Sequence, residues 1–370
     1  MTKIIYLDYN ATAPLLPEVK EAMISAFDYI GNPSSVHQFG RRCRNEIDKA
    51  RKKIAAAVDA TSKDITFTSG GTEANHLALS GLKLKHDAIY ASATEHASIY
   101  KNILPGNLIP VDIKGQVRLD ELEKCFIRAN PPKLVSIALA NSETGIVQHH
   151  LREIVELCHR YGCLVHTDAV QAFGKVPLSF KDLDVDLMTI SAHKIGGPKG
   201  VGALITKPNL ILKASYLGGG QEKGLRSGTE NIPAIVGFGV AAELASQVDW
   251  QPVQQLISFL IDQLKIINPH ICINSATDGL PNTLNFSTPG FNKDTQVIHF
   301  DLNGIAVSAG AACSSGKVER SHVLKAMGIA DIYTNSALRL SLSTETTLPD
   351  IEQFLAVWQG FQATQKVEGL

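Results

Sequence analysis

The chain has 370 residues, 44% hydrophobic and 19% charged, with a formal net charge of −1. This length and composition predict a folded globular protein with room for two domains, and they exclude a disordered chain. The near-zero charge gives no general attraction to nucleic acid or to an anionic membrane, and no apolar run approaches the roughly 18 residues of a membrane span. We therefore expect neither kind of partner.

The first ten residues, MTKIIYLDYN, lead directly into a strand-like run without a signal-peptide pattern. The cysteines are scattered along the chain and form no disulfide framework, which predicts a reducing, cytoplasmic location. They are Cys43, Cys125, Cys158, Cys163, Cys272 and Cys313.

Strand and helix patterns alternate along the first two thirds of the chain. Predicted strands cover 64–69, 87–93, 133–140, 163–169, 186–192 and 201–206, and predicted helices cover 72–84 and 149–162. Short apolar strands separated by helices are typical of an α/β fold with a mainly parallel sheet covered on both faces.

The pattern changes after about Trp250. A long helix over 253–267 is followed by strands over 282–287 and 336–343 and a helix over 350–361. We predict a large α/β domain over 15–250. A smaller α+β domain is predicted from 1–14 together with 251–370.

Polar residues follow five of the predicted strands. They are Gly70 to Glu73, Thr94 to His96, Asn141 to Glu143, Asp168 with Gln171, and His193 with Lys194. Because ligands gather at the carboxyl ends of the strands in open α/β sheets, these residues predict one shared site.

The residue types at these ends suit a phosphate-bearing aldehyde. Gly70, Gly71 and Thr72 open a predicted helix, where backbone N–H groups and the helix dipole attract a phosphate, although such a run is more often a capped turn. Lys194, among glycines, is either a solvated turn residue or a desolvated amine able to form a Schiff base. Asp168 is either a helix cap or the partner of a protonated pyridine nitrogen, as pyridoxal phosphate requires.

A second reactive element is the segment SAGAACSSGKV over 308–318. Cys313 lies there among small residues, whereas a buried structural cysteine normally has large apolar neighbours. The pattern predicts an accessible thiol on a loop, able to carry a reactive group.

Several motifs together resemble one known family. They are LDYNATAP, GNPSSVHQFG, FTSGGTEANHLAL, ATEH, ANSETGIVQ, HTDAVQAFGK, SAHKIGGPKGVGAL, GGGQEKGLRSGTEN and SAGAACSSG. Between about residues 5 and 345 the chain is similar to the cysteine desulfurases of the NifS/IscS type. These are pyridoxal phosphate enzymes of fold type I in the class V aminotransferase branch.

The resemblance implies a role for each matching residue. Lys194, Cys313 and His96 are the catalytic residues, with Lys194 joined to the cofactor and His96 stacked on its ring. Asp168 pairs with the ring nitrogen and Gln171 bonds the ring hydroxyl. The other cofactor contacts fall on Gly71, Thr72, Asn141, Ser191, His193 and Thr229, and the substrate carboxylate contacts fall on Asn141 and Arg339. Thr229 would reach the phosphate of a neighbouring subunit, which implies a homodimer.

The implied reaction converts L-cysteine to L-alanine and leaves a persulfide on Cys313. The sulfur then passes to an acceptor such as an Fe–S scaffold or a tRNA-thiolation protein. The nearest alternatives are a selenocysteine lyase and another class V aminotransferase-like enzyme, although a simple transaminase has no use for Cys313.

Unrelated classes of protein fit the sequence less well than this family does. The run GAACSSGKV has one residue too many for a P-loop, and Val318 replaces the required Ser or Thr. A zinc module built on the histidines and cysteines of 149–166 would place ligands on the apolar side of a helix, so no metal is expected. A sulfur relay without a cofactor would leave Lys194 and Asp168 without a purpose.

Overall fold

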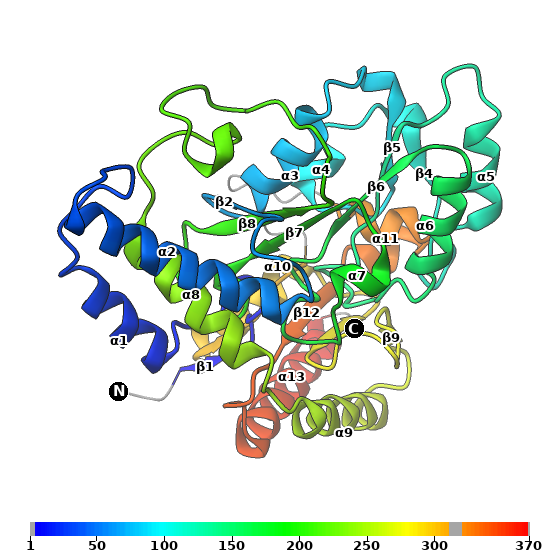
Figure 1. The fold of residues 1–370 in the computed structure, drawn as a ribbon. Coiled ribbons are helices and arrows are strands. Elements are labelled where there is room, and N and C mark those ends of the chain that lie inside the picture. The colour runs from blue at the N-terminus through cyan, green and yellow to red at the C-terminus, as the bar shows by residue number, and fades with distance from the viewer. Residues whose placement is uncertain (1–3, 311–319, 369–370) are drawn as a thin grey trace.

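A seven-stranded sheet forms the centre of the computed structural model, which describes residues 4–310 and 320–368 (Figure 1). Its strand order is β2-β8-β7-β6-β5-β3-β4. The strands are β2 (Ile65–Thr68), β3 (Ile89–Ser92), β4 (Leu108–Ile109), β5 (Leu134–Ser136), β6 (Leu164–Asp168), β7 (Leu187–Ser191) and β8 (Gly202–Thr206).

Successive residues of these strands enter two separate cores, one on each face of the sheet. Leu187 and Leu204 pack with the helix α3 (Gly71–Gly81). Met188 and Ile205, one residue further along, pack in the larger core with α2 (Gln38–Ala57), α6 (Leu151–Arg160) and α8 (Ile232–Ala245). Side chains alternate between the faces of a strand, so an all-apolar strand requires cover on both sides. The predicted α/β fold is confirmed.

The strand directions bring the predicted strand ends to one edge. β3 to β7 run parallel, and β8 runs antiparallel to both β7 and β2. β2 therefore points the same way as β7, and Gly202 at the start of β8 lies opposite both Thr68 and Ser191. As a result, the carboxyl ends of β2, β3, β5, β6 and β7 share an edge.

One predicted strand is shorter than expected. Residues 133–140 were expected to form a strand, but β5 ends at Ser136. Its partner β3 ends at Ser92, and beyond that point the N–H of Ala138 donates to Oε1 of Glu95 at 2.5 Å.

A second group of elements packs beside this sheet. β10 (Thr283–Ser287) pairs antiparallel with β12 (Ala337–Ser341) and β9 (Cys272–Ile273), and β1 (Ile5–Tyr6) pairs parallel with β11 (Ile305–Ala306). Their core also contains residues of α9 (Gln251–Ile267), α10 (Lys293–Leu302) and α13 (Leu348–Glu368). Apart from Ile5 and Leu7, its buried members all lie beyond residue 250. The domain boundaries at 14/15 and 250/251 stay a prediction.

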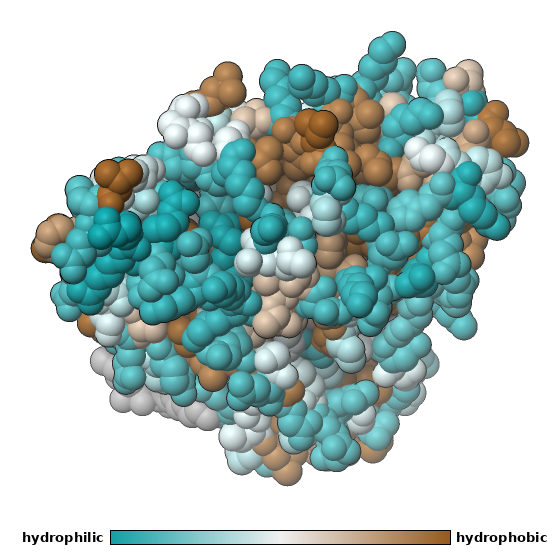
Figure 2. Space-filling model, in the orientation of Figure 1, coloured by the Kyte–Doolittle hydropathy of each residue, from teal (hydrophilic) through white to brown (hydrophobic). Residues whose placement is uncertain are grey.

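The remaining helices lie around these layers. They are α1 (Pro17–Ala26), α4 (Ala97–Tyr100), α5 (Leu119–Phe126), α7 (Phe180–Leu183), α11 (His322–Ala326) and α12 (Asp331–Thr334). No helix within 4–310 and 320–368 is both long and apolar enough to cross a membrane. Hydrophilic residues cover most of the face shown in Figure 2, and hydrophobic atoms gather over α3 and α4.

The N-terminal segment after β1 crosses from the second group of elements to the edge of the central sheet. The backbone N–H of Asn10 donates to Ser341 Oγ at 2.9 Å, and its side-chain Nδ2 donates to Thr283 Oγ1 at 2.8 Å. Asn10 is almost completely buried, so this segment is held firmly between both parts of the chain.

Candidate active site

A cavity of about 520 Å³ opens at the shared carboxyl edge of the strands. Ten of the predicted site residues line it. These are Gly71, Thr72, His96, Asn141, Asp168, Gln171, Ser191, His193, Lys194 and Arg339. Side chains from five strand ends and from β12 therefore meet in one space, as the strand directions require.

One end of the cavity has the features of an anion site. Helix α3 begins at Gly71 without a side-chain cap, so its first N–H groups are available to a ligand. Ser191 Oγ is buried on the same wall and has no hydrogen-bond partner among the described residues. A buried hydroxyl without a partner is costly, and a phosphate oxygen would satisfy it.

Gly71 also leaves the room that such a group needs. A Cβ atom at this position would come within 3.0 Å of Val170 Cγ2 and 3.7 Å of Ser191 Cβ. The residues at this end thus fit a phosphate.

Asp168 lies at the end of β6 with its carboxylate held on both oxygens. Asn75 Nδ2 donates to Oδ2 at 2.7 Å, and the N–H of Val170 donates to Oδ1 at 3.0 Å. Asn75 comes from α3, so the helix that begins at the anion site also orients this carboxylate. A fixed, buried carboxylate suits a cationic ring N–H.

Lys194 ends the short 3₁₀ turn Ala192–Lys194 that follows β7. Its Nζ donates to the backbone oxygens of Asn10 at 2.6 Å and Ala11 at 2.8 Å. The amine is therefore held inside the molecule by the N-terminal segment, in contrast to the solvated lysine of a surface turn.

Two histidines on the cavity wall are biased towards the neutral form. Burial by the surrounding protein lowers the pKa of His96, although the residue is exposed where it lines the cavity. Burial lowers the pKa of His193 to about 4, and the nearby Lys194 ammonium adds to this effect. Near neutral pH both rings can accept as well as donate a proton.

Arg339 and Asn141 already have protein partners. Arg339 donates through Nη1 to the backbone oxygen of Ser142 at 2.9 Å and through Nη2 to Asp8 Oδ1 at 2.6 Å. Its buried Nε has no partner among the described residues. Asn141 Nδ2 donates to the backbone oxygen of Thr94 at 2.9 Å, which joins two strand ends.

Thr229 does not line this cavity. Thr229 is exposed on the long connection between β8 and α8, which extends away from the sheet in Figure 1. That connection is anchored by Glu222, whose carboxylate accepts from both Nη atoms of Arg51 at 2.8 and 2.7 Å. Cys313 lies outside the described residues.

Several residues around the cavity escape prediction from the sequence. Asn10 and Lys175 occur only within quoted motifs, and His322 has no distinguishing neighbours. Asn75 offers the one usable signal, since it lies one helical turn after Gly71 and so on the same side of α3. Within the described part of the chain, no group of three or more His, Cys, Asp or Glu side chains is placed to hold a metal ion.

Comparison with known proteins places the whole chain in one group. Residues 5–354 match the family model described as aminotransferase class-V. The chain is 38% identical to the cysteine desulfurase IscS of Dictyoglomus turgidum, over 96% of this chain and 94% of that protein.

Solved structures agree with this grouping. The NifS-like protein from Rickettsia africae matches with a TM-score of 0.89 and 40% identity, over 97% of this chain and 99% of that one. A structure described as SspA in complex with cysteine matches with a TM-score of 0.78 and 32% identity, over 91% and 98% of the two chains.

Proposed function

This chain belongs to the aminotransferase class-V family, and we propose that it is a cysteine desulfurase that uses pyridoxal phosphate. The observation that carries the proposal is the meeting, in one cavity, of Lys194, the held carboxylate of Asp168 and an uncapped helix start beside the unpaired Ser191 hydroxyl. These are the groups that an amine-reactive, phosphate-bearing pyridine aldehyde requires.

The cofactor would be held along its whole length. Its phosphate would lie at the start of α3, with Gly71, Thr72, Ser191 and His193 around it. Its ring nitrogen would face Asp168, with His96 on the ring face and Asn141 beside it. Gln171 would donate to the ring hydroxyl oxygen, and Lys194 would bond the aldehyde carbon. When bound, pyridoxal phosphate withdraws electrons from the Cα and Cβ atoms of an amino acid.

The chain's own residues would then perform the remaining tasks. Arg339 binds the substrate carboxylate, since its planar fork matches two oxygens. Lys194 removes the Cα proton and His96 carries protons between the substrate and solvent. Because the pKa of His96 is lowered, its ring favours the neutral form and can accept a proton near pH 7.

The sulfur step needs the thiolate of Cys313. This thiolate attacks the sulfur of L-cysteine, an S–S bond forms and the Cβ–S bond breaks. The electron pair of the broken bond remains with Cβ, which takes up a proton, and Lys194 returns a proton to Cα. The products are L-alanine and a persulfide on Cys313, from which a sulfur acceptor takes the outer atom.

We further propose a homodimer, in which Thr229 contacts the phosphate bound by the partner subunit. Support comes from the exposure of Thr229 and from large apolar side chains that would otherwise face water. They include Ile30 (78% exposed), Val36 (87%), Ile211 (88%) and Leu217 (87%). The five described cysteines are all free thiols, which suits the cytoplasm.

The test is the absorption spectrum of the purified protein before and after L-cysteine, with alanine and sulfide measured in parallel. A visible band that responds to L-cysteine, with alanine released, is expected. A colourless protein that pyridoxal phosphate does not reconstitute would refute the cofactor. Turnover of L-selenocysteine without turnover of L-cysteine would identify a selenocysteine lyase.

Replacing Arg339 by alanine should mainly raise the KM for L-cysteine. Loss of a charge-assisted pair corresponds to about 1.5–3 kcal/mol, hence roughly a 10- to 150-fold rise. Steady-state kinetics with L-cysteine measures it. Asp8→Asn is the matched control, because it removes the negative charge that competes with the substrate carboxylate for Nη2 and should leave the KM equal or lower. An unchanged KM in Arg339→Ala would remove Arg339 from carboxylate binding.

A further inference from the structure

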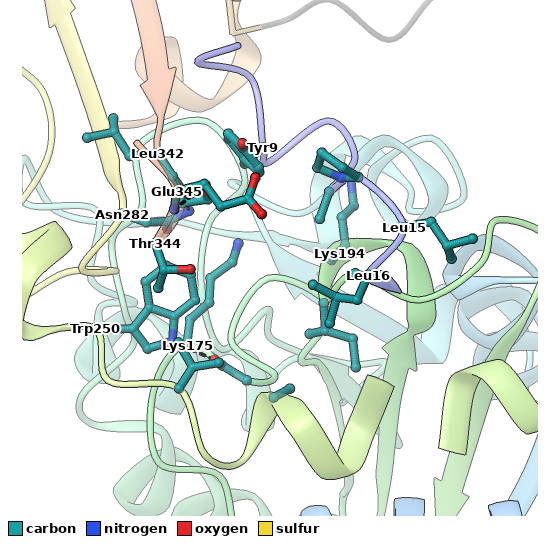
Figure 3. A pocket seen from close by; sticks show the side chains of 18 of the residues that line it. Tyr9, Leu15, Leu16, Lys175, Lys194, Trp250, Asn282, Leu342, Thr344 and Glu345 are labelled. Atoms are coloured by element: carbon teal, nitrogen blue, oxygen red, sulfur yellow. Dashed lines mark hydrogen bonds between the residues drawn. The ribbon is translucent and has the colours of Figure 1, made fainter. Parts of the chain in front are cut away.

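A second lysine lies behind the cavity and has no place in the proposed chemistry. Lys175 is only 6% exposed and follows Gln171 by one turn of chain. Figure 3 shows its side chain and that of Lys194 on the walls of a neighbouring pocket of about 130 Å³, which Trp250 and Leu16 also line. A buried lysine is costly unless its N–H groups are bonded, so its contacts indicate its purpose.

Lys175 Nζ donates to two side-chain amide oxygens. One is Oε1 of Gln171 at 2.8 Å, and the other is Oδ1 of Asn10 at 2.9 Å. No acidic side chain of the described residues forms an ion pair with it. Lys175 thus donates its hydrogen bonds to two neutral amides, and both amides belong to residues at the site.

These bonds decide which end of each amide faces the cavity. The ammonium form of lysine donates hydrogen bonds and does not accept them. Opposite an ammonium Nζ, each amide must therefore place its oxygen. With Oε1 of Gln171 turned to Lys175, its Nε2 points the other way and donates to the backbone oxygen of Asn10 at 3.0 Å. The second N–H of Nε2 remains for the cavity that Gln171 lines.

The arrangement does not depend on the charge of Lys175. Burial lowers the pKa of Lys175 well below its ordinary value, and the nearby Lys194 and Arg339 lower it further. A neutral amine still has two N–H groups, one for each amide oxygen. The neutral amine also has an accepting lone pair, and in that state the bond from Gln171 Nε2 to the backbone oxygen of Asn10 helps to keep Oε1 turned towards Lys175.

We propose that Lys175 is a positioning residue that fixes the amide of Gln171 with its N–H side towards the cofactor's ring oxygen. This inference rests on the proposed function. Without Lys175 the amide oxygen loses this donor, and only the bond from Nε2 to the backbone oxygen of Asn10 opposes a turned amide whose oxygen would repel the oxygen of the ring. Lys175 would then act on the cofactor only through Gln171.

The test compares Lys175→Met, Gln171→Leu and the double variant as holoenzymes with the wild-type protein. Either single change should shift the visible absorption maximum in the same direction and raise the Kd for pyridoxal phosphate about fivefold, as expected for one lost hydrogen bond. The double variant should add nothing further, because two residues that act through one contact are not additive.

Lys175→Gln is the rescue variant, since its amide N–H can still donate to Oε1. It should restore the wild-type spectrum and Kd. Thermal unfolding of the apoprotein separates a general loss of stability from loss of positioning, and Lys175→Gln keeps the test open if Lys175→Met does not fold.

Several results would overturn the proposal. These are an unshifted spectrum in Lys175→Met, a double variant whose shift is the sum of the two single shifts, or failure of Lys175→Gln to restore the band. A wild-type protein without any visible band would instead refute the proposed function itself, so the two failures are distinguishable.

Discussion

Replacing Lys194 by alanine should abolish the release of alanine and sulfide from L-cysteine, with a loss on the order of 10⁴-fold or more. Lys194 is proposed both to bond the cofactor and to move the Cα proton, and no second amine among the described residues is so placed. Its Nζ lies against the backbone oxygens of Asn10 and Ala11, and the amine of Lys175 points to other acceptors.

The measurement is the initial rate of alanine formation, together with borohydride reduction of the wild-type holoenzyme. Reduction should fix the cofactor to the peptide that contains Lys194. Lys213→Ala, a change at an exposed lysine, is the control and should keep full activity. Substantial activity in Lys194→Ala, or label on another peptide, would contradict the assignment.

Replacing Cys313 by alanine should leave the visible spectrum unchanged and reduce sulfide release from L-cysteine roughly a thousandfold, as loss of a catalytic nucleophile does. The cofactor contacts proposed above do not include Cys313, so its removal spares binding. The described cysteines are poor substitutes, because four are buried and burial raises the pKa of the half-buried Cys272.

Mass spectrometry of the protein after one turnover is the decisive measurement. One extra sulfur atom should appear on the peptide with Cys313 in the wild-type protein and be missing in Cys313→Ala. Cys272→Ala is the matched control and should behave as the wild type. Extra sulfur on another cysteine would identify a different nucleophile.

The sheet and much of the cavity follow from the sequence for simple reasons. Apolar runs such as 186–192 predict buried strands, and parallel strands must place their carboxyl ends together. Residues as far apart as Gly71, Asp168 and Lys194 were therefore expected to meet, and they line one cavity.

The sequence does not predict contacts between residues that belong to no local sequence pattern. β1 and β11 have two residues each, too few for a periodicity to show. Glu95 bonds the N–H of Ala138 beyond the end of β5, a contact between side chain and backbone that no local pattern predicts. The role of Lys175 depends on which way two amides face, and only coordinates can show that.

The hydrogen bonds that hold Asn10 have a consequence for the order of events during synthesis of the protein. Asn10 is bonded to Ser341, 331 residues later in the chain. At 5–20 residues per second, the ribosome needs roughly 15 to 70 seconds between making these two residues. In the later part of that interval, after residue 194 has been made, Asp168 and Lys194 can already lie on a folded sheet, while the backbone oxygens that hold the lysine still lack the support of Ser341. Vitamin B6 capture should therefore begin only once the last strand has emerged, which spares half-made chains from reacting with amino acids.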